Sequence, residues 1–525
     1  MAIGSPALAG YSLAITRLNS RWLSRQFIYL HFPNKDHIPL AVSALQHIPF
    51  KIDVSGPLLP SLIVLPQNNQ YWKVLGIAAK RTRQWSIPVA MNIAWVLVAF
   101  LFTIVDSLVD FGHFITIPGD AGYSIAAVWT YLLPLVVGWL HVGCQPDSDH
   151  LRSALDDAQE IAYVATDAEP ALAKDSACAR AIQPSTENLD HVNADEKKTA
   201  PIFNYSRVFI WSQNAKRILT LYENAASKAD QKITVQRGGG WMGNDGGTIA
   251  KYNRIGNEAE VVEYCMEEPE VPLDPNPICR SPQLPIPLTP CSCSAFPPSP
   301  EPPAVPFLTA GTYADADAHK RSPSTSSKYD EEATTAEVRA APEKPVFETE
   351  VFQRVIFAAI LALALQWGTT GAAILIQFNT PPKGFGCRSL TFSIYGAAGT
   401  VVLLLLLFSS ILSHLARHQS PRQERSGSKT LIGYIAAFTR WLAKTIAILN
   451  GFGILLSCTM QFAGVYDNCF CSSTIFGGNP NGLVSFIDQD IKGSEVYRYW
   501  IGGTIMAFGV SGLYTFAIYV ATPIG

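Results

Sequence analysis

Residues Val355–Gln377 read VIFAAILALALQWGTTGAAILIQ, an uninterrupted run without a charged side chain. The hydrocarbon core of a bilayer is about 30 Å thick, and a helix needs roughly 20 apolar residues to cross it. A helix suits this environment because it satisfies its own backbone hydrogen bonds where no water is available. The run therefore predicts a membrane-spanning helix.

Five further runs in the 525-residue chain pass the same test of length and apolar content. They are Ile87–Leu108, Tyr123–Val142, Thr391–Ser413, Leu442–Gly464 and Trp500–Ala521. Within the second of these, Pro134 removes one helix hydrogen bond, a loss that neighbouring helices can compensate. The sequence thus predicts an all-α membrane protein with about six transmembrane helices, grouped as two and then four.

Composition divides the chain into four regions. Residues 1–86 are predicted to form a cytosolic N-terminal region, and residues 87–143 the first two transmembrane helices. Residues 144–350 form a long loop, predicted to be cytosolic and mostly disordered, and residues 351–525 a four-helix transmembrane bundle. In the first region the apolar run Leu58–Leu65 is too short to cross a bilayer, so it is predicted to be a buried or interfacial piece.

Two parts of the long loop have a pattern of their own. Between about residues 205 and 228, apolar side chains recur at helical spacing among Lys and Arg, which predicts an amphipathic helix. Such a helix packs on the rest of the protein, lies on anionic lipid or offers its apolar face to a partner. Residues 267–343 begin with dense proline that excludes helices and sheets, so this part is predicted to be disordered. Its Pro-x-x-Pro spacings make it a candidate ligand for cytosolic proteins of the SH3 or WW type.

Orientation follows from Lys and Arg, which are retained on the cytosolic side of short loops. Four of them precede the first predicted span, and Arg417, Arg422, Arg425, Lys429 and Arg440 lie between the fourth and fifth. The N- and C-termini are therefore predicted to be cytosolic. The sequence indicates an integral membrane protein of the plasma membrane or an endomembrane, with the lipid bilayer as its first partner.

Cysteine positions bear on the same topology. Cys387, Cys469 and Cys471 fall in predicted outer loops, on the oxidising side where disulfides persist. A bridge from Cys387 to Cys469 or Cys471 would join two outer loops, and three free thiols are the alternative. Cys144, at the cytosolic edge of the second span, is a candidate for palmitoylation.

Polar residues near the middle of the predicted spans are neutral. They are Gln366, Thr369, Thr370, Asn450 and Gln461. Hydrogen bonding between helices explains such residues, whereas ionisable groups would have indicated a transport path or proton relay. Small residues at every fourth position favour close helix packing. They are Ala364, Gly368 and Ala372 in one span and Gly503, Ala507 and Ser511 in another.

Motifs for chemistry are weak or missing. Gly238, Gly240 and Gly243 match a dinucleotide-loop pattern, but Asn244–Gly247 follow and discourage the helix that a pyrophosphate site requires. No Ser-His-Asp or paired-carboxylate arrangement accompanies the spans, so no catalytic residue, metal ligand or cofactor is predicted and the protein is expected not to be an enzyme. A net charge of −3 gives no general attraction to nucleic acid.

Several blocks resemble uncharacterised multi-pass integral membrane proteins of filamentous fungi. The blocks include GYSLAITRLNSRWL from Gly10, WSIPVAMNIAWVLVAFLFTIVDS from Trp85, LALQWGTTGAAILI from Leu363, GFGCRSLTFSIYGAAGT from Gly384 and NCFCSSTIFGG from Asn468. The resemblance covers about half of the chain, at both ends. It implies a membrane topology and a fungal origin, and it supplies no functional residue.

Two functions are compatible with this pattern. The first is a non-enzymatic membrane scaffold whose proline-rich loop recruits cytosolic partners. The alternative is a small-solute transporter or channel in the four-helix half, with Gln366, Thr369, Thr370 and Asn450 lining a neutral path.

Overall fold

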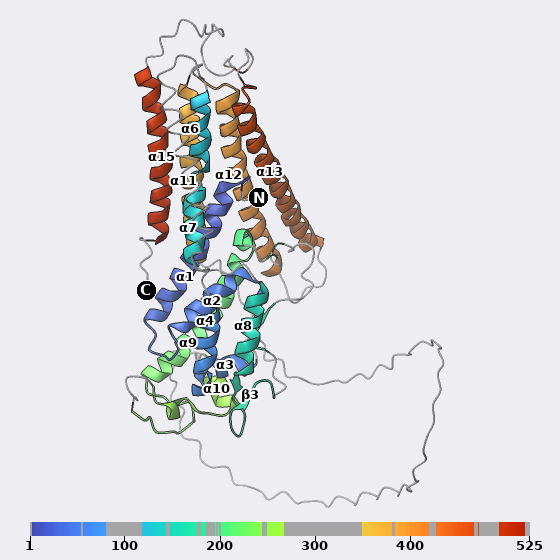
Figure 1. Cartoon of the computed structure of the whole chain (residues 1–525). Helices are drawn as coiled ribbons and strands as arrows, with labels where there is room; N and C mark the ends of the chain where they lie inside the picture. Colours follow the sequence, from blue (N-terminus) through green and yellow to red (C-terminus); the bar gives the residue numbers. More distant parts are fainter. Residues whose placement is uncertain are drawn as a thin grey trace, which may run out of the picture. The chain divides into compact units, whose positions relative to one another are not determined.

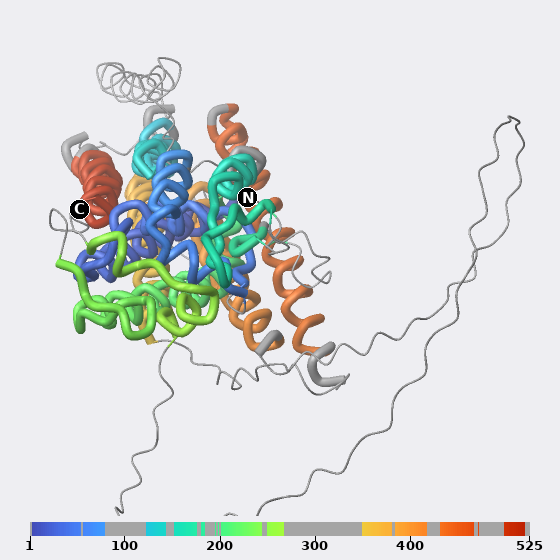
Figure 2. The backbone as a smooth tube through the Cα atoms, turned by 90° about the horizontal axis from the view of Figure 1, so that it is seen from below, coloured from blue at the N-terminus to red at the C-terminus, as the bar shows by residue number. Residues whose placement is uncertain are grey.

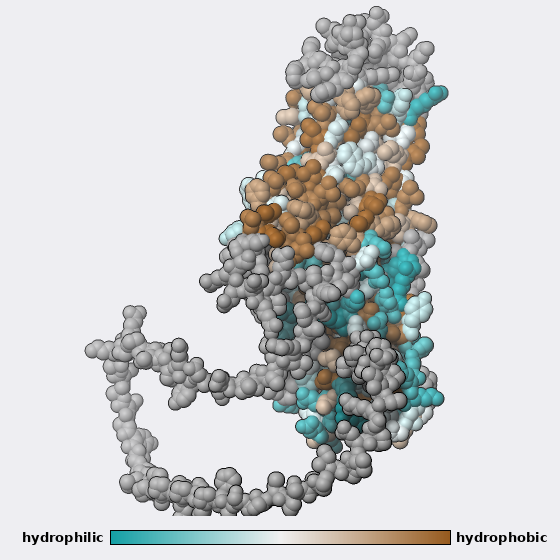
Figure 3. Space-filling model, turned by 180° about the vertical axis from the view of Figure 1, so that it is seen from behind, coloured by the Kyte–Doolittle hydropathy of each residue, from teal (hydrophilic) through white to brown (hydrophobic). Residues whose placement is uncertain are grey.

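The computed structural model describes fourteen stretches of the chain. They are residues 3–53, 56–79, 118–142, 148–175, 180–184, 195, 198, 201–243, 249–266, 349–380, 384–418, 427–466, 471 and 493–519. These residues form a bundle of long apolar helices and a set of shorter elements at one end of it (Figure 1). Figure 3 shows apolar residues over the bundle and more polar residues over the other end on the face it presents.

Six helices make up the described part of the bundle. They are α6 (Pro118–Trp129), α7 (Leu132–Val142), α11 (Thr349–Asn379), α12 (Cys387–His418), α13 (Gly427–Phe462) and α15 (Gly493–Tyr519). Five segments are long and apolar enough to cross a membrane, namely Gly122–Val142, Thr349–Asn379, Cys387–Ala416, Leu431–Gln461 and Arg498–Tyr519. The chain is thus an all-α membrane protein, as predicted. The predicted span Ile87–Leu108 lies outside the described residues.

Large apolar side chains point away from the protein on these helices. Ile360, Phe452 and Leu513 are 57%, 71% and 67% exposed, respectively. Side chains of this kind in contiguous patches require an apolar surrounding, because water would leave them unfavourably hydrated. Lipid tails provide that surrounding.

The shortest span is made of two helices that meet at Thr130 and Tyr131. Pro134 has no N–H to bond to the Thr130 carbonyl oxygen four residues earlier. The Ser511 hydroxyl of α15 lies 3.5 Å from that oxygen and donates to it. The same oxygen accepts the Leu133 N–H at 3.1 Å, so a tightened turn and a neighbouring helix together replace the hydrogen bond that proline removes.

The shorter elements form what we call the extramembrane unit, built from the described residues within 17–79, 148–184 and 201–266. Its helices are the second half of α1 (Pro6–Ile28), α2 (His37–Ala44), α3 (Leu58–Val64), α4 (Asn69–Ala79), α8 (Ser148–Glu160), α9 (Val208–Asp230) and α10 (Glu258–Cys265). Four short 3-10 helices accompany them in the described residues, η1 (Leu45–His47), η2 (Pro66–Asn68), η5 (Pro201–Ser206) and η6 (Lys251–Arg254). Strand β1 (Phe50–Ile52) pairs antiparallel with β4 (Ile182–Pro184), and β2 (Tyr163–Val164) with β3 (Ala171–Leu172).

This unit corrects in part the prediction that residues 144–350 are mostly disordered, because the described residues between 148 and 266 are folded. One buried core contains large side chains from segments that precede and follow the first two predicted spans in the sequence, including Phe27, Trp72, Trp211 and Tyr222. The Phe27 and Tyr222 rings lie 5.4 Å apart, centre to centre. Neither the segment before the first spans nor the segment after them forms a core by itself, so the composition of each segment, read separately, did not predict this fold. The predicted disordered part, residues 267–343, lies outside the described residues.

Helix α9 corresponds to the predicted amphipathic helix. Its apolar face is buried against the N-terminal region, where the Trp211 indole N–H donates to the Val42 carbonyl at 2.9 Å. Figure 2 shows the blue N-terminal segments beside the green segments of residues 201–266. The helix therefore packs on the rest of the protein, which is the first of the alternatives given for it in the sequence analysis. The run Leu58–Leu65 is likewise buried.

Helix α1 corrects part of a second prediction, because residues 3–16 of the region 1–86, predicted to be wholly cytosolic, pack within the bundle. Its first half packs inside the bundle, with Leu8, Tyr11 and Leu13 in one core with residues of α11, α12, α13 and α15. In Figure 1 the N-terminus lies among the bundle helices. No charged residue precedes Arg17, so residues 3–16 enter this apolar environment without burying a charge.

The start of α13 is a third correction. Arg440 was placed in a loop and the span was expected to begin at Leu442, whereas the helix begins at Gly427. Arg440 is buried, and its guanidinium donates to the Ser413 hydroxyl of α12 at 2.9 Å. Cationic residues are tolerated within this helix because the protein supplies partners for them.

Candidate functional site

The polar residues of α11 and α13 surround the beginning of α1. The first four N–H groups of a helix have no partner within the helix, and in an apolar surrounding each must find one elsewhere. The Gln366 amide oxygen accepts the Ala7 N–H at 3.1 Å, and its NH₂ group donates to the Gly396 carbonyl at 2.7 Å. Gln366 thus joins α1, α11 and α12 in one contact.

The chain before α1 is held in the same way. The Asn450 amide donates to the carbonyl oxygens of Gly4 at 2.8 Å and Tyr395 at 3.0 Å. The Tyr395 hydroxyl donates to the Ile3 carbonyl at 2.6 Å. Non-helical backbone at membrane depth is tolerated only where protein satisfies it. Asn450 and Tyr395 fill this role for residues 3 and 4.

Two hydroxyl groups complete the set. The Ser5 hydroxyl caps α1 by accepting the Leu8 N–H at 3.3 Å, and it donates to the Gly399 carbonyl at 3.1 Å. On the other side of α1, the Tyr514 hydroxyl of α15 donates to the Gly10 carbonyl at 2.6 Å. Side chains from α11, α12, α13 and α15 therefore all bind the backbone of residues 3–10, which we call the N-terminal plug.

The plug also fits by shape. A Cβ atom added at Gly4 would lie 1.7 Å from the Ala447 carbonyl oxygen, and one added at Gly451 would lie 3.4 Å from the Gly4 nitrogen. At Gly10 an added Cβ would lie 3.4 Å from the Ala362 Cα. Glycine is therefore required at residue 4, where the two backbones touch.

The other predicted intramembrane polar residues do not join the plug. The Thr369 hydroxyl donates to the Leu365 carbonyl of its own helix at 3.0 Å. Within the described ranges, the buried Thr370 hydroxyl and both side-chain polar atoms of Gln461 have no hydrogen-bond partner. The sequence thus identified two of the plug's contacts, Gln366 and Asn450. It missed Ser5, Tyr395 and Tyr514, for which the lack of charged side chains before Arg17 was the available signal.

Most of the predicted small residues pack helix on helix. An added Cβ at Gly368 would lie 2.4 Å from Val510 Cγ1, and one at Gly503 would lie 2.6 Å from Ile376 Cγ1, so α11 and α15 approach closely. Ala372, Ala507 and Ser511 are buried. Ala364 is exposed, which corrects its assignment to this face. Four residues exceed one helical turn of 3.6, so the face rotates along the helix.

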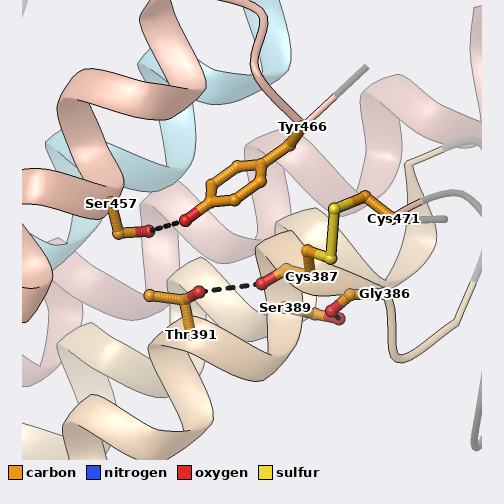
Figure 4. The surroundings of a disulfide bond; sticks show 7 residues. All are labelled: Gly386, Cys387, Ser389, Thr391, Ser457, Tyr466 and Cys471. Carbon is orange, nitrogen blue, oxygen red and sulfur yellow. Dashed lines mark hydrogen bonds between the residues drawn. A yellow bond between two sulfur atoms is a disulfide. The ribbon is translucent and has the colours of Figure 1, made fainter. Parts of the chain in front are cut away.

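A disulfide closes the end of the bundle remote from the extramembrane unit. Cys387 at the start of α12 is bonded to Cys471, with their Cα atoms 4.9 Å apart (Figure 4). Beside it the Tyr466 hydroxyl donates to the Ser457 hydroxyl at 3.1 Å. The structure thus selects one of the two predicted pairings. Cys469 and the palmitoylation candidate Cys144 lie outside the described residues.

At the other end, Asp195 ties the bundle to the extramembrane unit. Its carboxylate is fully buried, accepts hydrogen bonds from Lys444 of α13 and Tyr205 of η5, and lies 3.8 Å from the Arg440 guanidinium. A buried carboxylate requires such partners, because an unpaired charge in this place would be strongly unfavourable. The cluster fixes α13 against η5.

His47 lies buried near the same junction, with its ring 6.2 Å from that of Trp139. Burial lowers the pKa of His47 to about 3, and the positive charge of Arg207 acts in the same direction. The imidazole is therefore neutral at physiological pH. It serves here as a packed ring, not as a proton carrier.

Taken together, these contacts bind protein to protein. The plug occupies Gln366 and Asn450, and the Asp195 cluster holds the extramembrane unit in place. Comparisons with protein-family models, with curated proteins and with solved structures found no match to this chain. The proposals below therefore rest on the contacts of the chain itself.

Proposed function

We propose that the chain is a non-enzymatic membrane scaffold that presents residues 267–343 to cytosolic binding proteins. The observation that carries this proposal is the occupation of Gln366 and Asn450 by the protein's own backbone. Polar groups in a bundle that served a substrate would be expected to face a vacant path. Here both side chains bind the backbone at the start of the first helix, which is a structural task, and Asn450 also lines a pocket of about 390 Å³ between α12 and α13.

Both ends of the proline-rich segment are attached to the described fold. On one side the Asn224 amide donates to the Cys265 carbonyl at 3.0 Å, and the Lys228 ammonium to the Met266 carbonyl at 3.1 Å. On the other side the Trp22 indole N–H donates to the Glu350 carboxylate at 2.9 Å. The segment is thus a loop fixed at two points, a suitable arrangement for presenting short linear motifs.

A replacement experiment tests the scaffold. Residues 269–343 are exchanged for a Gly/Ser linker of equal length, and a second variant carries Ala at the four prolines of the two Pro-x-x-Pro motifs, Pro282, Pro285, Pro300 and Pro303. Binding to an array of purified SH3 and WW domains is expected for the natural chain and is lost in both variants. Binding that is absent from the natural chain, or unchanged in the variants, contradicts the proposal.

A small-solute transporter or channel is the second candidate, and one observation favours it. Gln366, Asn450, Tyr395 and Tyr514 come from four spans and all bind the plug between residues 3 and 10. If the plug left, these groups would line a neutral polar path. The plug would then be the closed state of that path.

Flux measurements separate the two candidates. In reconstituted vesicles, a variant lacking residues 2–8 is expected to pass small solutes faster than the full chain if the second candidate holds. Adding Asn450→Leu or Gln366→Leu would then reduce that flux. No flux from either protein across a broad solute panel excludes transport and leaves the scaffold.

We further propose that the extramembrane unit faces the cytosol. Lys and Arg gather in segments next to it, whereas the Cys387–Cys471 disulfide closes the opposite end of the bundle, as an oxidising outer side would allow. An epitope inserted at Pro285 should be accessible in intact cells only after permeabilisation. Labelling without permeabilisation would reverse the orientation.

A further inference from the structure

Three arginines follow one another on one face of α1, at the place where this helix leaves the bundle. Arg17, Arg21 and Arg25 are spaced by four residues, so their side chains are neighbours, about 6 Å apart along the helix. We call them the arginine ladder. Arg25 is exposed, and Arg17 and Arg21 are half-buried. Neither proposed function uses this face, although like charges at this spacing repel one another.

The arginine ladder begins at the edge of the membrane. One turn before Arg17, Leu13 packs on α7, where a Cβ added at Gly138 would lie 2.2 Å from Leu13 Cδ2. Helix α7 ends four residues later at Val142, and the charge of Arg17 acts on the Tyr519 hydroxyl at the end of α15. Val142 and Tyr519 are the last residues of two membrane-spanning segments. Arg17 therefore lies at the boundary of the hydrocarbon layer, and α1 continues from there into the extramembrane unit (Figure 1).

The length of the ladder matches the layer of lipid head groups. A bilayer measures about 40–45 Å with its head groups and about 30 Å without them, so each head-group layer is about 5–8 Å deep. One step of four helical residues covers about 6 Å of this depth. With Arg17 at the hydrocarbon boundary, Arg21 lies at about the depth of the lipid phosphates, and Arg25 lies at the aqueous surface.

The fold does not neutralise these charges. Among the described residues none of the three arginines is in an ion pair, and the Nε atoms of Arg17 and Arg21 are buried without a hydrogen-bond partner. Burial lowers the pKa of Arg21, and the positive charges of Arg25 and Arg17 act in the same direction. A half-buried guanidinium without a counter-ion is unfavourable, so an anion supplied from outside the fold would stabilise this face.

We propose that the arginine ladder binds the phosphodiester head group of an anionic phospholipid. A guanidinium donates two parallel N–H bonds to phosphate oxygens, and two guanidinium groups one turn apart can hold one phosphate between them. Arg17 and Arg21 make this contact, and Arg25 attracts the remaining negative charge of the lipid. Clusters of basic residues beside a membrane span recognise anionic lipid in this way. The depth of Arg17 and Arg21 in the bilayer makes a lipid, not a solute, the occupant.

Titration of the full-length protein in neutral detergent, followed by native mass spectrometry, tests the proposal. The probes are phosphatidylglycerol, phosphatidylcholine, which has the phosphodiester but no net charge, and glycerophosphoglycerol, the soluble head group without acyl chains. Arg17→Gln and Arg21→Gln are each expected to weaken binding of phosphatidylglycerol about fivefold, the factor that one basic residue contributes near an anionic surface. Arg25→Gln should have a smaller effect, because a more exposed charge is more strongly screened.

Arg180→Gln is the matched control. Arg180 belongs to the extramembrane unit, and its exposed guanidinium lies 2.6 Å from the Asp156 carboxylate. This variant removes the same charge, so it should change the affinity less than about twofold if binding is local to the ladder. Melting temperatures without added lipid show which variants are folded. Arg21→Lys keeps the charge but not the paired N–H donors, so it should bind with intermediate affinity, and it replaces Arg21→Gln if that variant does not fold.

The outcomes are distinct. Phosphatidylglycerol that binds more tightly than the other two probes, and less tightly to the Arg17 and Arg21 variants, supports the ladder as a lipid site. Equal binding of phosphatidylcholine overturns the proposal, because charge would then have no part in the contact. Equal binding of glycerophosphoglycerol overturns the lipid as the occupant. Equal weakening by Arg180→Gln and Arg21→Gln overturns the ladder as the site, since that result means general attraction to negative charge.

Discussion

Gln366 shows how one side chain can decide the position of a helix. Its oxygen accepts from Ala7, while its NH₂ group donates to the Gly396 carbonyl and, at 3.0 Å, to the Thr400 hydroxyl. An amide can donate and accept at the same time, which no charged side chain of similar size does. Gln366 therefore satisfies an unpaired helix N–H without placing a charge in the bilayer.

We predict that Gln366→Leu destabilises the protein by about 1–3 kcal/mol, the usual cost of a buried polar group left without its partner. The Ala7 N–H would lose its acceptor, with no water to replace it. Thermal unfolding in detergent measures the loss. Gln461→Leu is the control, because that amide is buried without a hydrogen-bond partner in the described residues, and its replacement should not destabilise.

His47 gives a second prediction, for pH. Its pKa is about 3 in the folded protein and near 6.5 in an unfolded chain. Below pH 6.5 the unfolded chain takes up a proton that the folded protein does not, so stability falls as the pH falls, by up to about 1.4 kcal/mol per pH unit down to about pH 3.

Melting temperatures between pH 7 and pH 5 measure this effect. His47→Gln should flatten their dependence on pH, whereas His31→Gln, at an exposed position, should leave it nearly unchanged. An equal slope in the natural protein and in His47→Gln would show that His47 is not the titrating group.

At the scale of elements, α1 connects the two halves of the protein. It begins inside the bundle and ends in the core of the extramembrane unit, where Leu23 and Phe27 are buried. Its 23 residues measure about 34 Å at 1.5 Å per residue. A continuous helix of this length resists bending, so the position of the plug and that of the unit are coupled.

Gly4→Val should expel the plug, because its side chain would overlap the Ala447 backbone. Maleimide labelling of a Ser5→Cys reporter measures this, since Ser5 is fully buried in the natural fold. The reporter should react slowly alone and at least about tenfold faster with Gly4→Val, because local opening of a tightly packed segment is otherwise rare. Gly453→Val, on α13 where an added Cβ meets nothing within 4 Å, should not change the rate.

The spans could be predicted from sequence because bilayer crossing depends on local apolar length, as in Val355–Gln377. The plug could not, because its residues 3–10 are too few to span and their partners lie hundreds of residues away. The extramembrane unit was missed for a related reason. Trp211 and Val42 each look like parts of separate polar regions until the fold brings them together.

For the whole molecule, the Cys387–Cys471 bridge joins residues 84 positions apart. Closing a loop of this length stabilises a fold by up to about 4.6 kcal/mol in the chain-entropy description, less where the helices already restrict the unfolded chain. Cys387→Ser should therefore lower the melting temperature. A reductant that does not cross membranes should give the same decrease in sealed vesicles when added on the side opposite the extramembrane unit, and no decrease from the other side.

The hydrogen bond between Tyr514 and Gly10 joins residues 504 positions apart, so it also sets an order of biogenesis. Gly10 is synthesised long before α15. Until α15 has been inserted, the Gly10 carbonyl lacks the Tyr514 donor and the first segment has no complete seat, which leaves it accessible to chaperones and quality-control proteases. Chains truncated before α15 should therefore be degraded even though their earlier helices have inserted.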